Sequence, residues 1–147
     1  MNDEESQAMW KLYTSHDESI CVRSTYQTLA EALPDACMLG LVKYIDYRRD
    51  SFDFGNALNF IVHKRKSFEH EREARSVVWK KKGSDLPFKS IGAGGLAVPV
   101  NIGGLIKEIF VSPGSKTMLR EIVEALATKY GLTVPVKQSA VNDPPGY

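Results

Sequence analysis

The chain has 147 residues, of which 43% are hydrophobic and 25% are charged, and its formal net charge at pH 7 is +1. These values are typical of a folded globular domain and argue against a disordered or fibrous protein. No stretch approaches the roughly eighteen apolar residues of a membrane-spanning helix, and residues 1–5 are acidic where a secretory signal is basic. We therefore expect a soluble, cytoplasmic protein with no membrane partner.

The charges are distributed unevenly along the chain. Residues 1–20 contain one basic and five acidic side chains, a local net charge of −4, whereas residues 64–82 contain eight basic and three acidic ones, a net charge of +5. Segments of opposite charge can meet within one molecule, between two copies, or on an anionic partner. A homo-oligomer is therefore one expectation, and charge alone does not choose among the three.

The cysteines and histidines lack the spacing of a metal site. Cys21 and Cys37 lie in apolar surroundings and outside any Cys-x-x-Cys pattern, so we predict that both are buried, reduced thiols. The histidines, His16, His63 and His70, are not spaced as an i, i+4 pair with a third partner. We predict neither a disulfide nor a metal site, and the sequence assigns no cofactor.

The first part of the chain predicts short helices and strands. We expect, in order, a helix over residues 4–13, a strand over 19–24, a helix over 26–33, a strand over 41–47 and a turn over 48–55. Asn2 or Asp3 can cap the first helix, because their side chains accept hydrogen bonds from its free backbone amides. Thr25 can cap the second helix, which Pro34 ends.

The remaining part predicts one long helix among short strands. Residues 56–63 fit a helix or a strand, and we favour the helix; around 68–71 we expect a turn or short helix that passes into a strand from about 73. After a turn over 81–85 and a loop over 86–95, we expect strands over 96–101 and 106–112, a helix over 116–130, and a strand over 133–137. Ser115 can cap the long helix, and Gly131 is its expected end. Its apolar residues repeat at helical spacing and predict one buried face, formed by Leu119, Ile122, Val123, Leu126, Ala127 and Tyr130.

Helices and strands that mix without strict alternation favour the α+β class. We predict a single layered domain over residues 1–138, followed by a flexible C-terminal tail over residues 139–147. Its sheet should be mixed or mainly antiparallel, with about five or six strands, and be packed by the long C-terminal helix and the shorter N-terminal helices.

The run Glu71-x-Glu73-x-Arg75 is the leading candidate for a polar site. On one face of a strand, the two carboxylates would lie about 6–7 Å apart, close enough to shift each other's pKa or to hold a cation. Arg75 can keep either carboxylate ionised or bind an anion. A solvated ladder of charges, or an internal network of ion pairs, explains the same residues without a site. The polar cleft that we predict consists of Trp10, Tyr13, Arg23, Glu71, Glu73 and Arg75.

Two basic triplets, at residues 64–66 and 80–82, flank this run and can contact phosphates. The aromatic residues Phe60, Phe68 and Trp79 are interleaved with them. Basic triplets at turns also occur as solvated ends of helices and strands. Nucleic-acid binding is therefore an alternative that the sequence leaves open.

Four further patterns occur in a fixed order. They are Glu5-Ser6-x-x-Met9-Trp10-x-x-Tyr13, Val22-x-Ser24-Thr25-x-x-x-Leu29, Tyr44-x-Asp46-Tyr47 and Lys64-Arg65-x-x-Phe68-x-x-Glu71-x-Glu73-x-Arg75. In this order they are similar to the motifs of a bacterial family described only as a domain of unknown function. The resemblance covers about residues 4–138.

Members of that family usually have an additional N-terminal half before the Met-Trp-x-x-Tyr motif. This chain starts close to that motif, so the resemblance implies that it holds only part of the family's site. Such short proteins resemble stand-alone cassette proteins of mobile elements. A partner or a second copy would then complete the cleft.

Three functions fit these observations, and whether the protein is an enzyme stays open. The first, which we expect, is a small binding or interaction module with a polar cleft. The second is a nucleotide-dependent transferase, because the order Arg23, Ser24-Thr25, Glu71-x-Glu73 is similar to that of ADP-ribosyltransferases, in which the last glutamate orients the ribose. Here, however, the arginine and the serine-threonine pair are adjacent. The third is a nucleic-acid-binding module.

Overall fold

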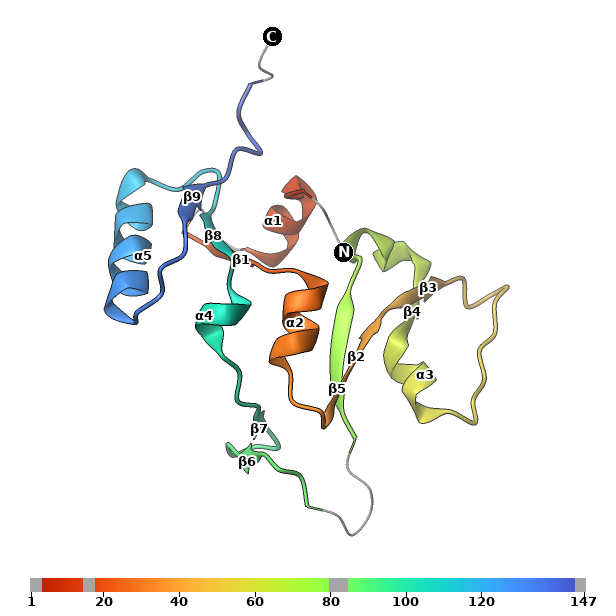
Figure 1. Cartoon of the computed structure of the whole chain (residues 1–147). Helices are drawn as coiled ribbons and strands as arrows, with labels where there is room; N and C mark the ends of the chain where they lie inside the picture. The colour runs from red at the N-terminus through yellow and green to blue at the C-terminus, as the bar shows by residue number, and fades with distance from the viewer. Residues whose placement is uncertain (1–3, 15–17, 80–84, 145–147) are drawn as a thin grey trace. The chain divides into compact units, whose positions relative to one another are not determined.

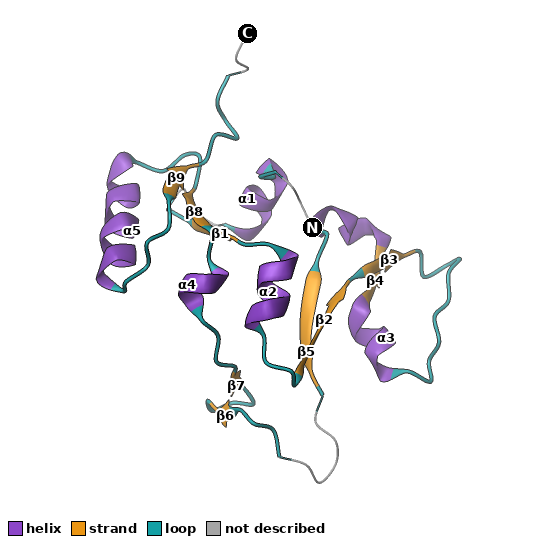
Figure 2. Ribbon diagram, viewed as in Figure 1, coloured by secondary structure: helices purple, strands orange, loops and turns teal. Residues whose placement is uncertain are grey.

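The structure is a computed structural model of the chain, and it describes residues 4–14, 18–79 and 85–144. Helices and strands occur together in these residues, so the fold belongs to the predicted α+β class (Figure 2). The predicted caps Asn2 and Asp3, the basic residues 80–82, His16, and all of the predicted turn except Asp85 lie outside the described residues.

The chain divides into two compact units. Residues 33–99 form what we call the inserted unit, and residues 2–32 together with 100–147 form the terminal unit. The inserted unit contains twelve Lys and Arg against eight Asp and Glu, a net charge of +4, and the terminal unit contains seven against ten, a net charge of −3. The two ends of the chain contribute to the terminal unit, and the middle of the chain forms the inserted unit.

The terminal unit is built around a three-stranded sheet with the order β1-β8-β9 (Figure 1). β1 (Ile20–Arg23) pairs antiparallel with one side of β8 (Glu108–Val111), and β9 (Val136–Gln138) pairs parallel with the other. Ile109 and Val111 of β8 are buried, whereas all four residues of β1 are exposed. The central strand therefore carries the apolar core of this unit.

Two short helices of the terminal unit begin at side-chain caps. α1 (Gln7–Tyr13) begins after Ser6, whose hydroxyl accepts a hydrogen bond from the Met9 backbone nitrogen, so the helix starts three residues later than predicted. α2 (Tyr26–Ala32) begins after Thr25, whose hydroxyl accepts from the backbone nitrogen of Thr28, as predicted.

Two further helices flank β8 in the chain. α4 (Ile102–Leu105) contacts α2, and α5 (Thr117–Lys129) contacts β9. The predicted cap of α5 is wrong, because the Ser115 hydroxyl donates to the Ser112 carbonyl and gives no cap bond to the helix. Gly131 ends the helix as predicted, with φ of 71°, a conformation that glycine adopts without steric cost.

The inserted unit consists of short elements. They are β2 (Cys37–Leu41), β3 (Lys43–Ile45), α3 (Ala57–Val62), β4 (His63–Arg65), the 3₁₀-helix η1 (Lys66–Glu71), β5 (Ala74–Val78), β6 (Lys89–Ser90) and β7 (Leu96–Ala97). β2 pairs antiparallel with β5, β3 pairs parallel with β4, and β6 pairs antiparallel with β7. The predicted helix over residues 56–63, and the predicted change from a short helix to a strand near residue 73, are confirmed.

Several finer predictions about the sheet are wrong. The described strands form one three-stranded and three two-stranded sheets, where the sequence predicted one sheet of about five or six strands. The strands are only two to five residues long, so each pairs with one or two neighbours inside its own unit. The apolar run predicted as one strand over residues 41–47 is divided at Val42 between β2 and β3.

Two predictions about exposure also change. Cys21 is exposed, because it lies on the exposed strand β1, and Cys37 is half-buried. The predicted tail is attached at its first residue, since Ser139 is buried and its backbone nitrogen donates to the carbonyl of Val111. Within the described residues, no helix has the length and apolar character needed to cross a membrane.

Candidate functional site

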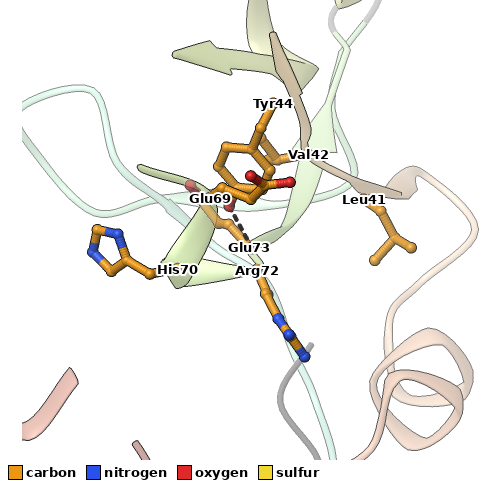
Figure 3. A pocket seen from close by; sticks show the side chains of 7 residues that line it. All are labelled: Leu41, Val42, Tyr44, Glu69, His70, Arg72 and Glu73. Atoms are coloured by element: carbon orange, nitrogen blue, oxygen red, sulfur yellow. Dashed lines mark hydrogen bonds between the residues drawn. The ribbon is translucent and has the colours of Figure 1, made fainter. Parts of the chain in front are cut away.

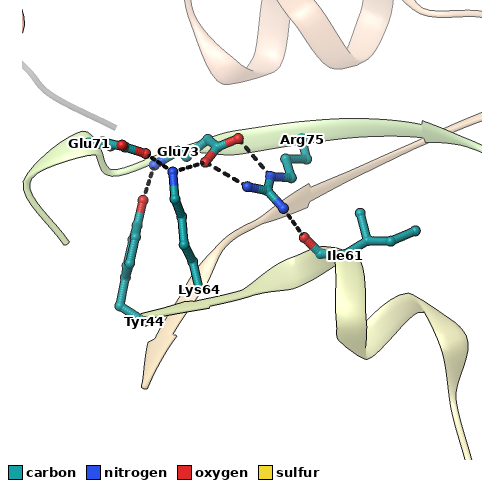
Figure 4. Close-up of polar contacts among 6 residues, drawn as sticks. All are labelled: Tyr44, Ile61, Lys64, Glu71, Glu73 and Arg75. Atoms are coloured by element: carbon teal, nitrogen blue, oxygen red, sulfur yellow. Dashed lines mark hydrogen bonds and ion pairs between the residues drawn. The ribbon is translucent and has the colours of Figure 1, made fainter. Parts of the chain in front are cut away.

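Glu73 is held by both its backbone and its side chain (Figure 4). Its backbone nitrogen donates to the Tyr44 hydroxyl at 2.8 Å, and its carbonyl accepts from the Val42 backbone nitrogen at 2.9 Å. Its carboxylate receives Arg75 at two points, with Nε 2.6 Å from Oε1 and Nη2 3.0 Å from Oε2, and Lys64 Nζ lies 3.3 Å from Oε2. These contacts fix both the backbone and the side chain of Glu73.

Lys64 joins the two glutamates into one network. Its ammonium group pairs with the Glu71 carboxylate and also with that of Glu73, and Arg75 donates further to the carbonyl oxygen of Ile61. Two carboxylates and two cations therefore form a cluster with no net charge. The sequence named all four residues but predicted neither this pairing nor the role of the Tyr44 hydroxyl.

The sequence predicted both glutamates on one face of a strand, and this prediction is wrong. Glu71 ends η1, Glu73 precedes β5, and Arg72 between them has φ of 44° and ψ of 51°, the left-handed conformation. Arg72 is the only non-glycine residue with positive φ among the described residues. This local turn of the backbone, instead of the pleat of a strand, brings both carboxylates to Lys64.

The network shifts the pKa of its members in the directions expected for ion pairs. Hydrogen bonds from Arg75, and then from Lys64, lower the pKa of Glu73 below its ordinary value of 4.5. The same contact raises the pKa of Arg75, and the hydrogen bond to Glu71 raises the pKa of Lys64. These shifts keep Lys64 and Arg75 cationic and Glu73 anionic at neutral pH.

An open pocket of about 500 Å³ lies next to this network. It is lined by Leu41, Val42, Tyr44, Glu69, His70, Arg72 and Glu73 (Figure 3). The side chains of His70, Arg72 and Leu41 extend in three directions around it. Among the described residues, the side chains of Glu69, His70 and Arg72 form neither a hydrogen bond nor an ion pair. The pocket is thus lined by the ion-paired Glu73 and by three polar side chains that have no such partners among the described residues.

Trp10, Tyr13 and Arg23, the other residues of the predicted cleft, belong to the terminal unit. Trp10 is 8% exposed and its indole nitrogen donates to the Glu5 carboxylate at 3.2 Å, whereas Tyr13 is 63% exposed. Arg23 pairs with Glu108 across β1 and β8 at 2.9 Å. Each side chain therefore has its own local surroundings within that unit.

Glu108 resembles Glu73 in being held by two cations. Lys137 from β9 and Arg23 from β1 both pair with it, and they lower the pKa of Glu108, with Lys137 as the larger cause. Because the three residues lie on three adjacent strands, this ion-pair group links the whole sheet.

The serine-threonine pair named for the transferase alternative has structural contacts. The Ser24 hydroxyl donates to the Leu105 carbonyl at 2.6 Å, and the Thr25 hydroxyl caps α2. These contacts give the serine and the threonine after β1 a structural role that requires no substrate.

No sequence pattern predicts that Tyr44 and Lys64 contact the glutamates. The two residues are direct partners in the parallel pair β3–β4, although twenty positions separate them in the chain. Both were present in the family-like motifs, and the register of this pair is what places them together.

No group of three or more metal-ligating side chains gathers in the described part of the chain. No family model, curated protein or solved structure matches the chain.

Proposed function

We propose that the inserted unit is a small-molecule-binding module whose pocket takes a compact anionic ligand that also bears hydroxyl groups. The observation that carries this proposal is Arg72, an exposed, uncommitted arginine at the pocket in the left-handed conformation. That conformation costs a non-glycine residue about 1–2 kcal/mol, and such backbone strain is concentrated at functional sites. Arg72 occupies a backbone conformation that favours glycine, and its guanidinium group lies beside the pocket.

The chemistry of the lining defines the ligand class. Arg72 supplies a planar, permanently charged donor for a phosphate or carboxylate, and His70 is a second donor among the lining residues. Glu69 accepts hydrogen bonds from ligand hydroxyl groups. Glu73 is the member of the ion-pair network that lines the pocket, and Arg75 and Lys64 balance its charge.

The experiment is a calorimetric titration of the full chain with three probes: pyrophosphate, ADP and NAD. The variant is Arg72→Gly, which removes the guanidinium and accepts the same backbone conformation. A lost charged hydrogen bond weakens binding by roughly 10- to 100-fold. The matched control is Lys89→Ala, which removes an exposed cation of the same unit outside the pocket.

Two outcomes contradict the proposal: no heat of binding with any of the three probes at millimolar concentration, or equal affinities of wild type and Arg72→Gly. The NAD titration also addresses the transferase alternative. Release of nicotinamide by the wild type, lost in Glu73→Gln, would favour that alternative over simple binding.

A further inference from the structure

The loop between β3 and α3 forms an aromatic cluster with the helix that follows it. Phe52 stacks on His63, with ring centroids 4.7 Å apart and an interplanar angle of 11°. Phe54 and Phe60 lie 5.0 Å and 5.4 Å from Phe52, and 5.7 Å from each other. The four rings belong to one continuous group, separate from the residues that line the pocket at Arg72.

The outer rings of this cluster are exposed to solvent. Phe54 is 70% exposed and Phe60 is 56% exposed, although burial of a phenylalanine side chain is worth about 1.5–3 kcal/mol. Adjacent exposed aromatic rings mark a surface that is covered by a binding partner. The partner must therefore offer flat apolar faces of its own.

Cations accompany the rings in the same segment. Arg48 and Arg49 lie in the loop, and Arg65 lies over the ring of Tyr47 at 5.0 Å, at the end of the strand that begins with His63. We use the name aromatic surface for the rings of Phe52, Phe54, Phe60 and His63, which the loop carrying Arg48 and Arg49 and the strand ending at Arg65 contribute to or adjoin in the chain.

Each acidic residue of the loop accepts a hydrogen bond from a backbone amide of the same loop. Asp46 accepts from the Arg48 backbone nitrogen, Asp50 from the Asp46 nitrogen, and Asp53 from the Gly55 nitrogen. Asp46 also lies 3.8 Å from Arg49, a distance too long for a strong pair, and the Arg49 side chain is 86% exposed. The arginines thus project from a loop whose carboxylates are engaged with its own amides.

We infer that the aromatic surface binds single-stranded nucleic acid. Bases supply the flat faces that stack on exposed rings, and phosphates complement the arginines and the +4 charge of the inserted unit. A duplex hides its bases in the stack and cannot use the rings. An anionic membrane surface offers the same negative charge but no flat faces that stack on the rings.

The experiment measures fluorescence anisotropy of labelled oligo(dT) and oligo(U) of about fifteen nucleotides, a length chosen to exceed the site of one small domain. The full chain is titrated at several salt concentrations. We expect the affinity to fall steeply with salt concentration. Arg49→Ala should reduce the slope of log affinity against log salt concentration by about the contribution of one phosphate contact. Comparison of the two oligomers separates DNA from RNA.

The decisive variants are Phe54→Ala and Phe60→Ala, each expected to weaken binding about 5- to 100-fold. Tyr130→Ala is the matched control, because it removes an aromatic ring that is 74% exposed in the acidic terminal unit. Circular dichroism of every variant confirms that it folds. Equal affinity of Phe54→Ala and wild type, a flat salt response, equal binding of a duplex, or binding only to phosphatidylserine vesicles would each overturn the inference.

Discussion

The hydroxyl of Tyr44 accepts a hydrogen bond from the backbone nitrogen of Glu73, and this contact joins two separate pairs of strands. Tyr44 belongs to the parallel pair β3–β4, whereas Glu73 continues β5 of the antiparallel pair β2–β5. The Val42 nitrogen donates to the Glu73 carbonyl from the other side. These contacts thus link two of the three two-stranded sheets that the described residues of the inserted unit form.

Removal of this hydroxyl is expected to destabilise the inserted unit. Tyr44→Phe leaves the half-buried Glu73 nitrogen without its acceptor, at a cost of about 1–3 kcal/mol in the free energy of unfolding. Urea denaturation, followed by fluorescence and circular dichroism, measures the change. Tyr47→Phe, at an exposed tyrosine of the same unit, should stay within about 0.5 kcal/mol of wild type. Equal losses in both variants would contradict the assigned role.

The lowered pKa of Glu73 predicts a loss of stability in acid. Because the folded state holds this carboxylate ionised below the ordinary value of 4.5, the unfolded chain binds more protons between the two pKa values. Its contribution is therefore present above about pH 4.5 and disappears as pH falls through the folded pKa. Glu73→Gln should be less stable than wild type at pH 7, and the difference should shrink towards pH 3.

Glu69→Gln is the control for this pH series, since the Glu69 side chain has no ion pair among the described residues. Its difference from wild type should be small and similar at both ends of the series. A difference between wild type and Glu73→Gln that stayed constant from pH 7 to pH 3 would show that Arg75 and Lys64 do not act through the charge of Glu73.

The left-handed conformation of Arg72 predicts different effects on stability for two small substitutions. Arg72→Gly relieves a steric cost of about 1–2 kcal/mol but adds about 0.5–1 kcal/mol of chain entropy to the unfolded state. We expect a net stabilisation of up to about 1 kcal/mol, whereas Arg72→Ala keeps the strain and gains nothing. Thermal and urea denaturation of the two variants in parallel test this. Equal stability of Gly and Ala would indicate that the backbone there is unstrained.

The elements with strong local signals were predicted well. Gly131 ends α5 and Thr25 caps α2, because both signals depend on residues a few positions apart. The buried face of α5 was only half right. Leu119 and Val123 are half-buried and Ala127 is buried, whereas Ile122, Leu126 and Tyr130 are exposed. Periodicity finds an apolar sector, and tertiary packing decides how much of it is covered.

The sequence identified the charged residues of the candidate site but did not predict how they are arranged. Glu71, Glu73 and Arg75 stood out as a dense polar run, and the structure brings them together. The contact with Tyr44 depends on the register of a parallel pair, and the turn at Arg72 depends on a conformation that arginine rarely adopts. Neither feature has a local sequence signal, so no pattern in the run could reveal them.

The insertion of one unit into the chain of the other sets an order for folding on the ribosome. β1 is synthesised first but has no partner until β8 emerges, about ninety residues later. All the strand pairs of the inserted unit close within that interval. The nascent chain can therefore complete its middle before its beginning, with Ile20 and Val22 still unpaired and exposed to chaperones until residues 108–111 arrive.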